Sequence, residues 1–494
     1  MPRMASLAAT AALIIGVTMW AWFSSISPTR SQPALEKVIS DAILHSQPAA
    51  DSGIAIAVIK DGALYYSGGF GFRDRGMSAK VDANTFFGIG STTKAFTSMA
   101  ISMLAEDKPA FRLDVPIKQY FPDFAMKDPE ATVKMTLKHV LSQTTGLPRH
   151  DALWYLGPFT RSQLLYRLQY LEPYPAAFGN SFTYNNMMYM MAGHVLESVA
   201  GLTWKQFVKT RILDPLNMSE SNFSIGELSS MANYAKGYKG MKELPLKDVE
   251  NIGPAAEINS SVLEMTNWVL LLLNHGVASN GTRLIAVSDL ERMYTPVIQL
   301  PGGSGTAYGL GWFVDKLQDK RHVYHPGDTD GYSAYVSFMP DDGLAVIALT
   351  NQHASSFPDK VATRIYEFLL SGSGMDRAHL SRGLAQISSA QQEIDAHALS
   401  VPVPHASLSD YTGMYSHPGY GDIAVSSAAN DYISYYQNNW LLRQRADGTF
   451  YFDLHAFGTD FQPRVFFNRT SAGKVDSLGI RFEPTIDPIR FMKR

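Results

Sequence analysis

Two β-hairpins, one near each end of the sequence, constrain the fold of this chain more than any other feature. Residues 54–59 form an unbroken apolar run, and an Asp-Gly turn leads from them into a β-rich run at 63–67. Residues 332–339 and 344–349 repeat this pattern around a Pro-Asp-Asp-Gly turn. Such runs predict hairpins, and a strand that is apolar throughout is covered on both faces. We therefore expect a sheet that contains both hairpins, with helices above and below it.

Other segments carry apolar residues at the three-and-four spacing of a buried helix face. These segments are residues 35–44, 96–103, 190–199, 262–272 and 361–369. Strands at both ends of a region, with helices between them, predict an α+β domain whose antiparallel sheet is assembled from the two ends.

The chain has 494 residues, which is too long for a single hydrophobic core, because single cores stop growing at about 250–300 residues. We expect a large domain at 31–372, a connector rich in Ser, Gln and Ala at 373–405, and a small domain at 406–494. Short aromatic-rich runs separated by turns predict a small antiparallel barrel or sandwich at the C-terminal end. These runs lie at 411–415, 423–425, 432–436, 450–454, 465–467 and 479–482.

An apolar stretch near the N-terminus predicts export. Arg3 precedes apolar residues 5–26, and a run of about 20 apolar residues can span a bilayer as a helix. A secretory signal within residues 1–30 is the alternative. No clear small-x-small cleavage site follows the stretch, so we favour an uncleaved membrane anchor. Either interpretation places the remaining chain in the periplasm or on the outer face of the cytoplasmic membrane.

Composition excludes several partners and chemistries. The formal net charge of -3 provides no basic field for nucleic acid. The absence of cysteine excludes disulfides, thiolate metal sites and a cysteine nucleophile. The 13 histidines include no His-Glu-x-x-His pair. We therefore expect neither a metal nor another cofactor.

Ser91 and Lys94 are the first candidates for catalysis. They stand three residues apart in a segment that opens the helix predicted at 96–103, so their side chains share one face. Serine is a poor nucleophile until a base removes its proton, and burial can make a lysine neutral enough to be that base. Backbone N–H groups at a helix N-terminus also suit a developing oxyanion. Taken alone, Ser-x-x-Lys fits an ordinary N-cap serine equally well.

Two further segments carry candidate site residues. Tyr184 and Asn186 stand at a predicted loop-to-helix junction, from which Tyr184 can reach a cleft and Asn186 can orient a substrate amide or the lysine. His325 and Gly327 precede the second hairpin, and Gly327 would let a substrate approach the strand edge. The N–H of Asp328 could complete an oxyanion hole. Each segment alone has a simpler interpretation, an N-cap asparagine beside a packed tyrosine or a turn with a solvated histidine.

Together the three segments resemble class C serine β-lactamases and the related low-molecular-weight D,D-peptidases and esterases. The shared pattern is Ser-x-x-Lys, then Tyr-x-Asn, then His/Lys-x-Gly, and the resemblance covers about residues 35–370. Flanking segments at 113–122, 137–148, 213–218 and 308–312 also look like this family. The resemblance implies a β-lactamase/transpeptidase-like fold.

The resemblance also implies roles for the candidate residues. Ser91 would be acylated, while Lys94 and Tyr184 would shuttle protons. The cleft would be lined by Asn186, His325 and Gly327, and the oxyanion hole formed by the N–H groups of Ser91 and Asp328. The aromatic segments 411–415 and 420–421 look like the lipocalin-like appendage of some family peptidases.

The sequence departs from the family pattern at three places. Gln143 stands where the family usually has His, Lys108-Pro109 replaces a usual turn glycine, and Asp328 stands where Gly often follows the third motif. The acidic side chain of Asp328 leads to the hypothesis that anionic substrates such as β-lactams are disfavoured. Efficient turnover of penicillin or cephalosporin would refute it.

The expected function is therefore serine hydrolysis through an acyl-Ser91 intermediate, acting on peptide or amide bonds and on peptides with D-residues. An esterase or β-lactamase of the same fold is the alternative. A penicillin-binding sensor that deacylates slowly is an alternative of another class. The expected partner is a small-molecule or peptide substrate, and the sequence leaves homo-oligomerisation open.

Overall fold

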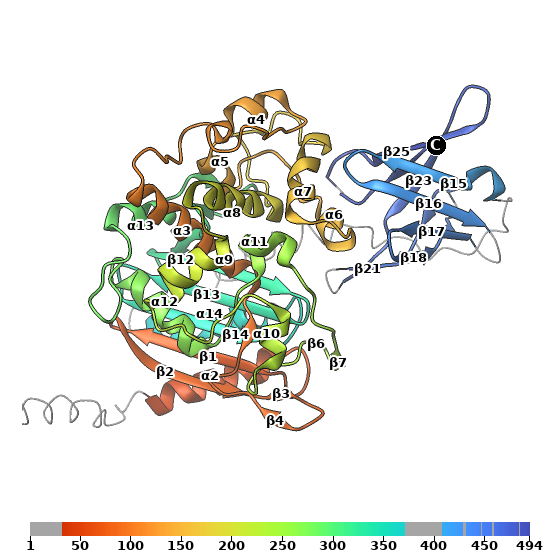
Figure 1. Cartoon of the computed structure of the whole chain (residues 1–494). Helices are drawn as coiled ribbons and strands as arrows, with labels where there is room; N and C mark the ends of the chain where they lie inside the picture. The colour runs from red at the N-terminus through yellow and green to blue at the C-terminus, as the bar shows by residue number, and fades with distance from the viewer. Residues whose placement is uncertain (1–31, 371–407, 428–430, 446, 457–458, 484) are drawn as a thin grey trace, which may run out of the picture.

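The structure is a computed structural model that describes residues 32–370 and, apart from 428–430, 446, 457–458 and 484, residues 408–494. The first part of the chain forms an eight-stranded sheet. Figure 1 shows helices packed around this sheet, and a strand-rich body formed by the C-terminal residues. The two sequence segments predicted as N-terminal anchor or signal (1–30) and as connector (373–405) lie outside the described residues.

The central sheet joins the two ends of the first domain, as the hairpins predict. β1 (Ile54–Lys60) pairs antiparallel with β14 (Leu344–Thr350), with Ala57 opposite Ile347. The strand order is β2-β1-β14-β13-β12-β11-β10-β9. The other strands are β2 (Ala63–Phe70), β9 (Ile298–Gln299), β10 (Ala307–Tyr308), β11 (Phe313–Leu317), β12 (Lys320–Thr329) and β13 (Tyr332–Met339). The prediction of an antiparallel sheet assembled from both ends is confirmed.

Both faces of this sheet are covered. Ile54, Ile56 and Val58 pack with the apolar faces of α2 (Gln32–Ser46) and α14 (Phe357–Leu370), in one cluster of buried side chains. The alternate residues of β1 belong to a second cluster, which contains α12 (Val262–Leu273) and most of the helical region. An apolar side chain is therefore buried at nearly every position of β1, and this explains its unbroken apolar sequence.

The predicted helices are present. Two of them, α3 (Thr93–Asp107) and α8 (Asn186–Ala200), contact each other and the short helix α11 (Gly253–Ala256). The shorter helices are α4 (Pro129–Lys134), α5 (Leu137–Leu141), α6 (Asp151–Leu156), α7 (Arg161–Arg167), α9 (Trp204–Val208), α10 (Ile225–Ser230) and α13 (Val287–Met293). Among the residues described, no helix combines the length and apolar character needed to cross a bilayer.

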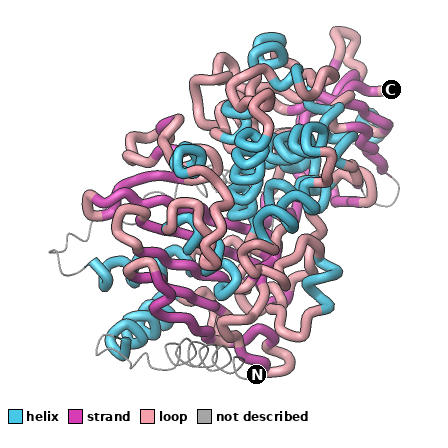
Figure 2. The backbone as a smooth tube through the Cα atoms, turned by 60° about the vertical axis from the view of Figure 1, so that its left-hand side comes forward, coloured by secondary structure: helices cyan, strands magenta, loops and turns pink. Residues whose placement is uncertain are grey.

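The C-terminal body is a nearly closed, barrel-like antiparallel sheet, in agreement with the predicted small β domain. Its strand order is β18-β17-β16-β15-β25-β24-β23-β20-β19. The strands are β15 (Gly413–His417), β16 (Gly421–Ser427), β17 (Asp431–Tyr435), β18 (Asn438–Leu441), β19 (Arg443–Gln444), β20 (Phe450–Tyr451), β23 (Arg464–Arg469), β24 (Val475–Ile480) and β25 (Ile489–Lys493). Tyr411, predicted to begin a strand, instead ends a 3-10 turn, Leu408–Tyr411. Figure 2 shows most helices gathered between the two sheets.

Candidate active site

Ser91 lies at the start of α3, in a 3-10 turn formed by Gly90–Thr92 rather than in the α-helix itself. Gly90 has a positive φ of 52°, and a Cβ added there would lie 2.7 Å from the backbone nitrogen of Asp328. Only glycine tolerates this conformation and this approach. The glycine therefore lets the turn that carries Ser91 lie directly against β12.

The amine of Lys94 faces three oxygens. Its Nζ lies 2.9 Å from Ser91 Oγ, 2.8 Å from Asn186 Oδ1 and 3.0 Å from the carbonyl oxygen of Ala255. A neutral amine has two N–H bonds and one lone pair. The amide and carbonyl oxygens can only accept hydrogen bonds, so they take both N–H groups and the lone pair is left for the hydroxyl of Ser91.

The surroundings of Lys94 favour its neutral form. The side chain is fully buried, and this burial, followed by the nearby guanidinium of Arg149, holds the pKa of Lys94 well below its ordinary value. Asp151 acts in the opposite direction, more weakly. An amine of lowered pKa at hydrogen-bond distance from a serine hydroxyl has the geometry and the protonation state of a general base.

Tyr184 reaches the same hydroxyl from the other side. Its phenol donates to Ser91 Oγ over 2.7 Å. Asn185, the next residue, caps α8 by accepting from the N–H of Met188, and this cap fixes where the loop ends. Burial raises the pKa of Tyr184 above its ordinary value, so the phenol keeps its proton. Tyr184 is therefore set up to donate a proton, whereas Lys94 is set up to accept one.

His325 lies inside β12, although the sequence analysis placed it in a segment before the hairpin without predicting a strand. Residues 325–329 pair with β13, while the pairing of β12 with β11 ends at Tyr324. No described strand covers the other edge of 325–329. Pro326 and Gly327 weaken the strand signal in the sequence, yet both are tolerated beside an open edge.

The ring of His325 is neutral and has a defined tautomer. Its Nδ1 lies 2.6 Å from the carbonyl oxygen of Pro326, to which it must donate, so Nε2 accepts from the hydroxyl of Tyr308 at 3.1 Å. Burial, with a smaller effect of Lys94, lowers the pKa of His325 to about 3. The interpretation as a solvated histidine is therefore wrong, because the ring is 1 % exposed.

Arg149 and Asp151 belong to the site, and the sequence analysis missed them. The guanidinium carbon of Arg149 lies 5.0 Å from the ring centre of Tyr184, and its Nε donates to Asp151. Asp151 also accepts from Nδ2 of Asn186 at 3.3 Å and from Nε1 of Trp154 at 2.6 Å. The available signal was the run Arg149-His150-Asp151, three ionisable residues after the Gly-Leu-Pro segment.

These residues surround one cleft of about 150 Å³. Its lining includes all the predicted site residues with side chains except Lys94, which lies fully buried beneath Ser91. The lining also includes Arg149, Lys247 and Asp330. The backbones of 89–91 and 327–328 touch here, since a Cβ on Gly327 would lie 3.1 Å from the nitrogen of Ser91. The two N–H groups expected to hold an oxyanion thus come from adjoining segments.

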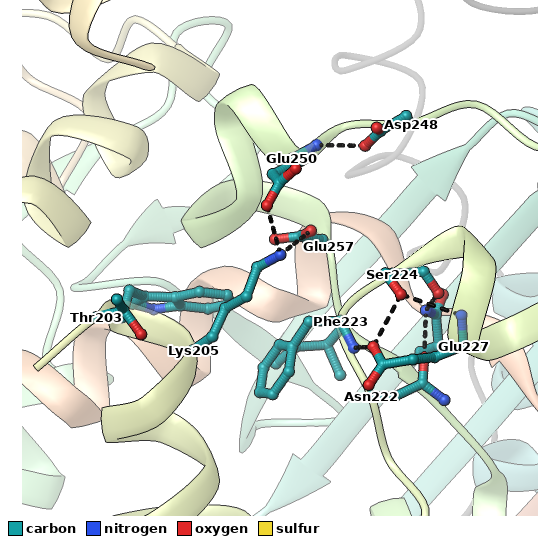
Figure 3. Close-up of polar contacts among 12 residues, drawn as sticks. Thr203, Lys205, Asn222, Phe223, Ser224, Glu227, Asp248, Glu250 and Glu257 are labelled. Carbon is teal, nitrogen blue, oxygen red and sulfur yellow. Dashed lines mark hydrogen bonds and ion pairs between the residues drawn. The ribbon is translucent and has the colours of Figure 1, made fainter. Parts of the chain in front are cut away.

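A partly buried ion pair supports the wall that carries the carbonyl of Ala255. Lys205 of α9 bridges Glu257, two residues beyond Ala255, at 2.8 Å and Glu250 at 3.0 Å (Figure 3). The side chain of Glu257 is 4 % exposed, and burial raises its pKa to about 7 despite the opposing effect of Lys205. The pair ties α11 to the helical region behind Lys94.

Replacing Lys205 with Met should destabilise the protein by about 2–3 kcal/mol at pH 8, because it leaves the carboxylate of Glu257 buried without its cation. Because the pKa of Glu257 is higher in the folded state, the folded protein binds more protons than the unfolded chain. The contribution of Glu257 to the free energy of unfolding therefore decreases as the pH rises from about 4.5 through 7. The loss in Lys205→Met should therefore be smaller at pH 5.5, where Glu257 binds a proton. Urea unfolding at the two pH values measures both quantities.

The matched control is Lys209→Met, which removes an exposed pair with Asp214. Surface pairs of this kind contribute about 0–1 kcal/mol. An equal loss in the two variants, or a Lys205→Met loss that does not change with pH, would contradict a specific role for the partly buried pair.

Within the described part of the chain, no group of three or more His, Asp or Glu side chains could hold a metal ion.

The site and the fold together define the β-lactamase/transpeptidase-like class of proteins. The site has a buried amine, a serine hydroxyl and a phenol within hydrogen-bond distance, and the fold has an antiparallel sheet and a helical region. Residues 44–370 match the family described as beta-lactamase, so the chain belongs to the beta-lactamase family, whose members are generally serine hydrolases. Residues 399–493 match a domain of unknown function, DUF3471.

Two known relatives are similar to much of the chain. An unguisins hydrolase of Aspergillus violaceofuscus is 29% identical over 421 residues, which cover 77% of this chain and 74% of the relative. The protein flp of Staphylococcus aureus is 25% identical over 343 residues, covering 67% of this chain and 65% of that protein.

Two solved structures share the fold. The octameric penicillin-binding protein homologue from Pyrococcus abyssi superimposes with a TM-score of 0.60 and 22% identity, over 93% of this chain and 99% of that chain. SurE with D-Leu gives a TM-score of 0.53 and 19% identity, over 94% and 99% of the two chains. The fold and the family expected from the three motifs are thus confirmed.

Proposed function

We propose that this protein hydrolyses peptide or amide bonds through an acyl-Ser91 intermediate. The observation that carries the proposal is the hydroxyl of Ser91, which lies 2.9 Å from the amine of Lys94 and 2.7 Å from the phenol of Tyr184. One neighbour is held in a form that accepts a proton and the other in a form that donates one. Nucleophilic acyl transfer needs both.

In the proposed acylation step, Ser91 Oγ attacks the substrate carbonyl carbon while its proton moves to Nζ of Lys94. The N–H groups of Ser91 and Asp328 stabilise the negative oxygen of the tetrahedral intermediate. The C–N bond then breaks, and the leaving nitrogen takes its proton from Tyr184. The ammonium of Lys94 returns the proton to the phenolate. In deacylation, water attacks the acyl carbon while one of its protons moves to Lys94. The ester C–O bond then breaks, Ser91 Oγ takes the proton from Lys94, and the carboxylic acid leaves.

The preference for peptides, including peptides with D-residues, rests on the relatives. One is named as a hydrolase of unguisins, and a structural neighbour was solved with D-Leu. The test is hydrolysis of matched peptide p-nitroanilides with L- or D-residues at the cleaved bond, beside p-nitrophenyl esters and β-lactams. Turnover of esters alone would favour the esterase alternative. A stable acyl-protein without turnover would favour the slowly deacylating sensor.

Poor turnover of β-lactams remains part of the proposal. Asp328 and Asp330 line the cleft beside the β12–β13 turn, where an ionised carboxylate would oppose an anionic substrate. Burial raises the pKa of Asp328, so its opposition should strengthen as the pH rises. Asp328 accepts from Ser333 Oγ at 2.5 Å, which holds its carboxyl in place. Efficient penicillin hydrolysis by the purified chain would refute this part.

Substituting Arg149 with Met should move the acid limb of the pH–rate profile to higher pH. Arg149 lowers the pKa of Lys94, whereas Asp151 raises it. Without the guanidinium, more of the amine is protonated at a given pH, and a protonated amine cannot accept the proton of Ser91. The rate of acylation at about pH 6 should fall about 3- to 10-fold more than the rate at pH 9.

The charge-conserving control is Arg149→Lys, whose acid limb should stay close to that of the wild type. Rates of ester hydrolysis between pH 5 and 10 provide the profile. A parallel loss at every pH in Arg149→Met would mean that Arg149 acts on the site without tuning Lys94.

We also propose that the enzyme acts outside the cytoplasmic membrane, because apolar residues 5–26 precede the catalytic domain. Fractionation of cells, with protease added to intact spheroplasts, tests this location. The structural neighbour from Pyrococcus abyssi is octameric, and light scattering of the purified chain would establish whether it too forms oligomers.

A further inference from the structure

The C-terminal domain packs directly against the helices beside the cleft. Arg167 of α7 donates to the carbonyl oxygens of Pro418 and Gly419 at 3.1 and 2.7 Å. The rings of Phe159 and Tyr436 meet edge to face with their centres 5.2 Å apart. Figure 1 shows α6 and α7 as the helices nearest to this domain. The contact lies beside the segment that carries Arg149 and Asp151.

Two side chains of the C-terminal domain bind His150, the residue between Arg149 and Asp151 in the sequence. Oε2 of Glu483 accepts from the backbone N–H of His150 at 3.0 Å. Nε2 of His150 lies 2.9 Å from the carbonyl oxygen of Glu172, to which it must donate, so Nδ1 accepts from the hydroxyl of Tyr420 at 2.9 Å. His150, Tyr420 and Glu483 are all buried. The ring of Tyr420 stacks on Phe482 with a centre distance of 5.7 Å.

The backbone of His150 depends on these contacts. Its φ is 47°, the left-handed region, and α6 begins at the next residue without a side-chain cap from His150. A non-glycine residue in this region costs on the order of 1 kcal/mol. The hydrogen bonds that His150 makes to Glu483 and Tyr420 offset that cost. This conformation also turns the chain so that residues 149 and 151 both reach the site.

A chain of contacts connects the two neighbours of His150 to the residues that contact Ser91. Asp151 bonds Asn186, which bonds the amine of Lys94, and Arg149 lies over the ring of Tyr184. We infer that Glu483 and Tyr420 are positioning residues of the acylation site, through which the C-terminal domain sets the geometry of Lys94 and Tyr184 by way of His150. The inference rests on the proposed function of Ser91.

The test compares full-length variants by the rate at which a fluorophosphonate probe labels Ser91. Glu483→Leu keeps the size of the side chain and removes the acceptor, and we expect its rate to fall about 10- to 100-fold, since small displacements of catalytic groups cost that much. Glu483→Gln keeps an acceptor oxygen and should stay within about threefold of the wild type. Tyr420→Phe removes one hydroxyl and should slow labelling about 3- to 10-fold.

The matched control is Arg167→Met, which loosens the same interface away from His150. Its labelling rate below the unfolding transition should equal that of the wild type, even where its Tm falls. Wild-type rates in both Glu483→Leu and Tyr420→Phe would overturn the inference, as would an equal loss in Arg167→Met. If Glu483→Leu does not fold, Tyr420→Phe decides. Failure of the wild type itself to be labelled at Ser91 would instead refute the proposed function.

Discussion

Ser91→Ala should abolish labelling by a fluorophosphonate and lower peptide or ester turnover by more than about 10⁴-fold. The oxygen atom that this variant removes is the one that would form the acyl bond. Lys94 keeps its hydrogen bonds to Asn186 and Ala255, and we expect the Tm to stay within a few degrees of the wild type. Intact-protein mass spectrometry after labelling gives the measurement.

The matched control is Ser98→Ala in α3, seven residues beyond Ser91. Ser98 is buried against Tyr189 and does not line the cleft. Labelling of Ser91 should persist in this variant with unchanged stoichiometry. A probe that still modifies Ser91→Ala at the wild-type rate would remove Ser91 from the reaction, whatever the geometry around it.

Spacing alone predicts proximity only within each motif of the site. Ser91 and Lys94 are one helical turn apart, and Asn186 is two residues from Tyr184, so each pair is local. The convergence of the three motifs on one cleft, and the fold, were predicted from the family resemblance that the motifs carry. The double-sided burial of β1 could be predicted as well, because its apolar run has no polar face.

What could not be predicted depends on contacts between distant parts of the chain. Glu483 meets a residue 333 positions away, and nothing in the local sequence of either marks that contact. Arg149 lies in a loop and Asp151 is the first residue of α6, so no periodicity connects either side chain to its partner. The strand around His325 was missed for a different reason, since Pro326 and Gly327 disfavour a strand except at an open sheet edge.

Lys94→Met should lower the rate of acylation about 10³- to 10⁴-fold, because the hydroxyl of Ser91 loses the group that accepts its proton. Tyr184 cannot replace the amine, since burial keeps its phenol protonated. The thioether fills nearly the same volume as the lysine side chain. Asn186 and Ala255 lose a donor, so a moderate fall in Tm is expected alongside the kinetic loss. Stopped-flow acylation by an activated ester measures the rate.

Lys94→Arg separates a base from a fixed positive charge. A guanidinium keeps the charge and the donors but does not give up its proton at any pH the protein survives. If Lys94 is the base, Lys94→Arg should be as slow as Lys94→Met, and small primary amines should restore part of the rate in Lys94→Ala by entering the space left behind. Retention of wild-type acylation in Lys94→Arg would instead mean that Lys94 acts by its charge, and the base would have to be sought elsewhere in the cleft.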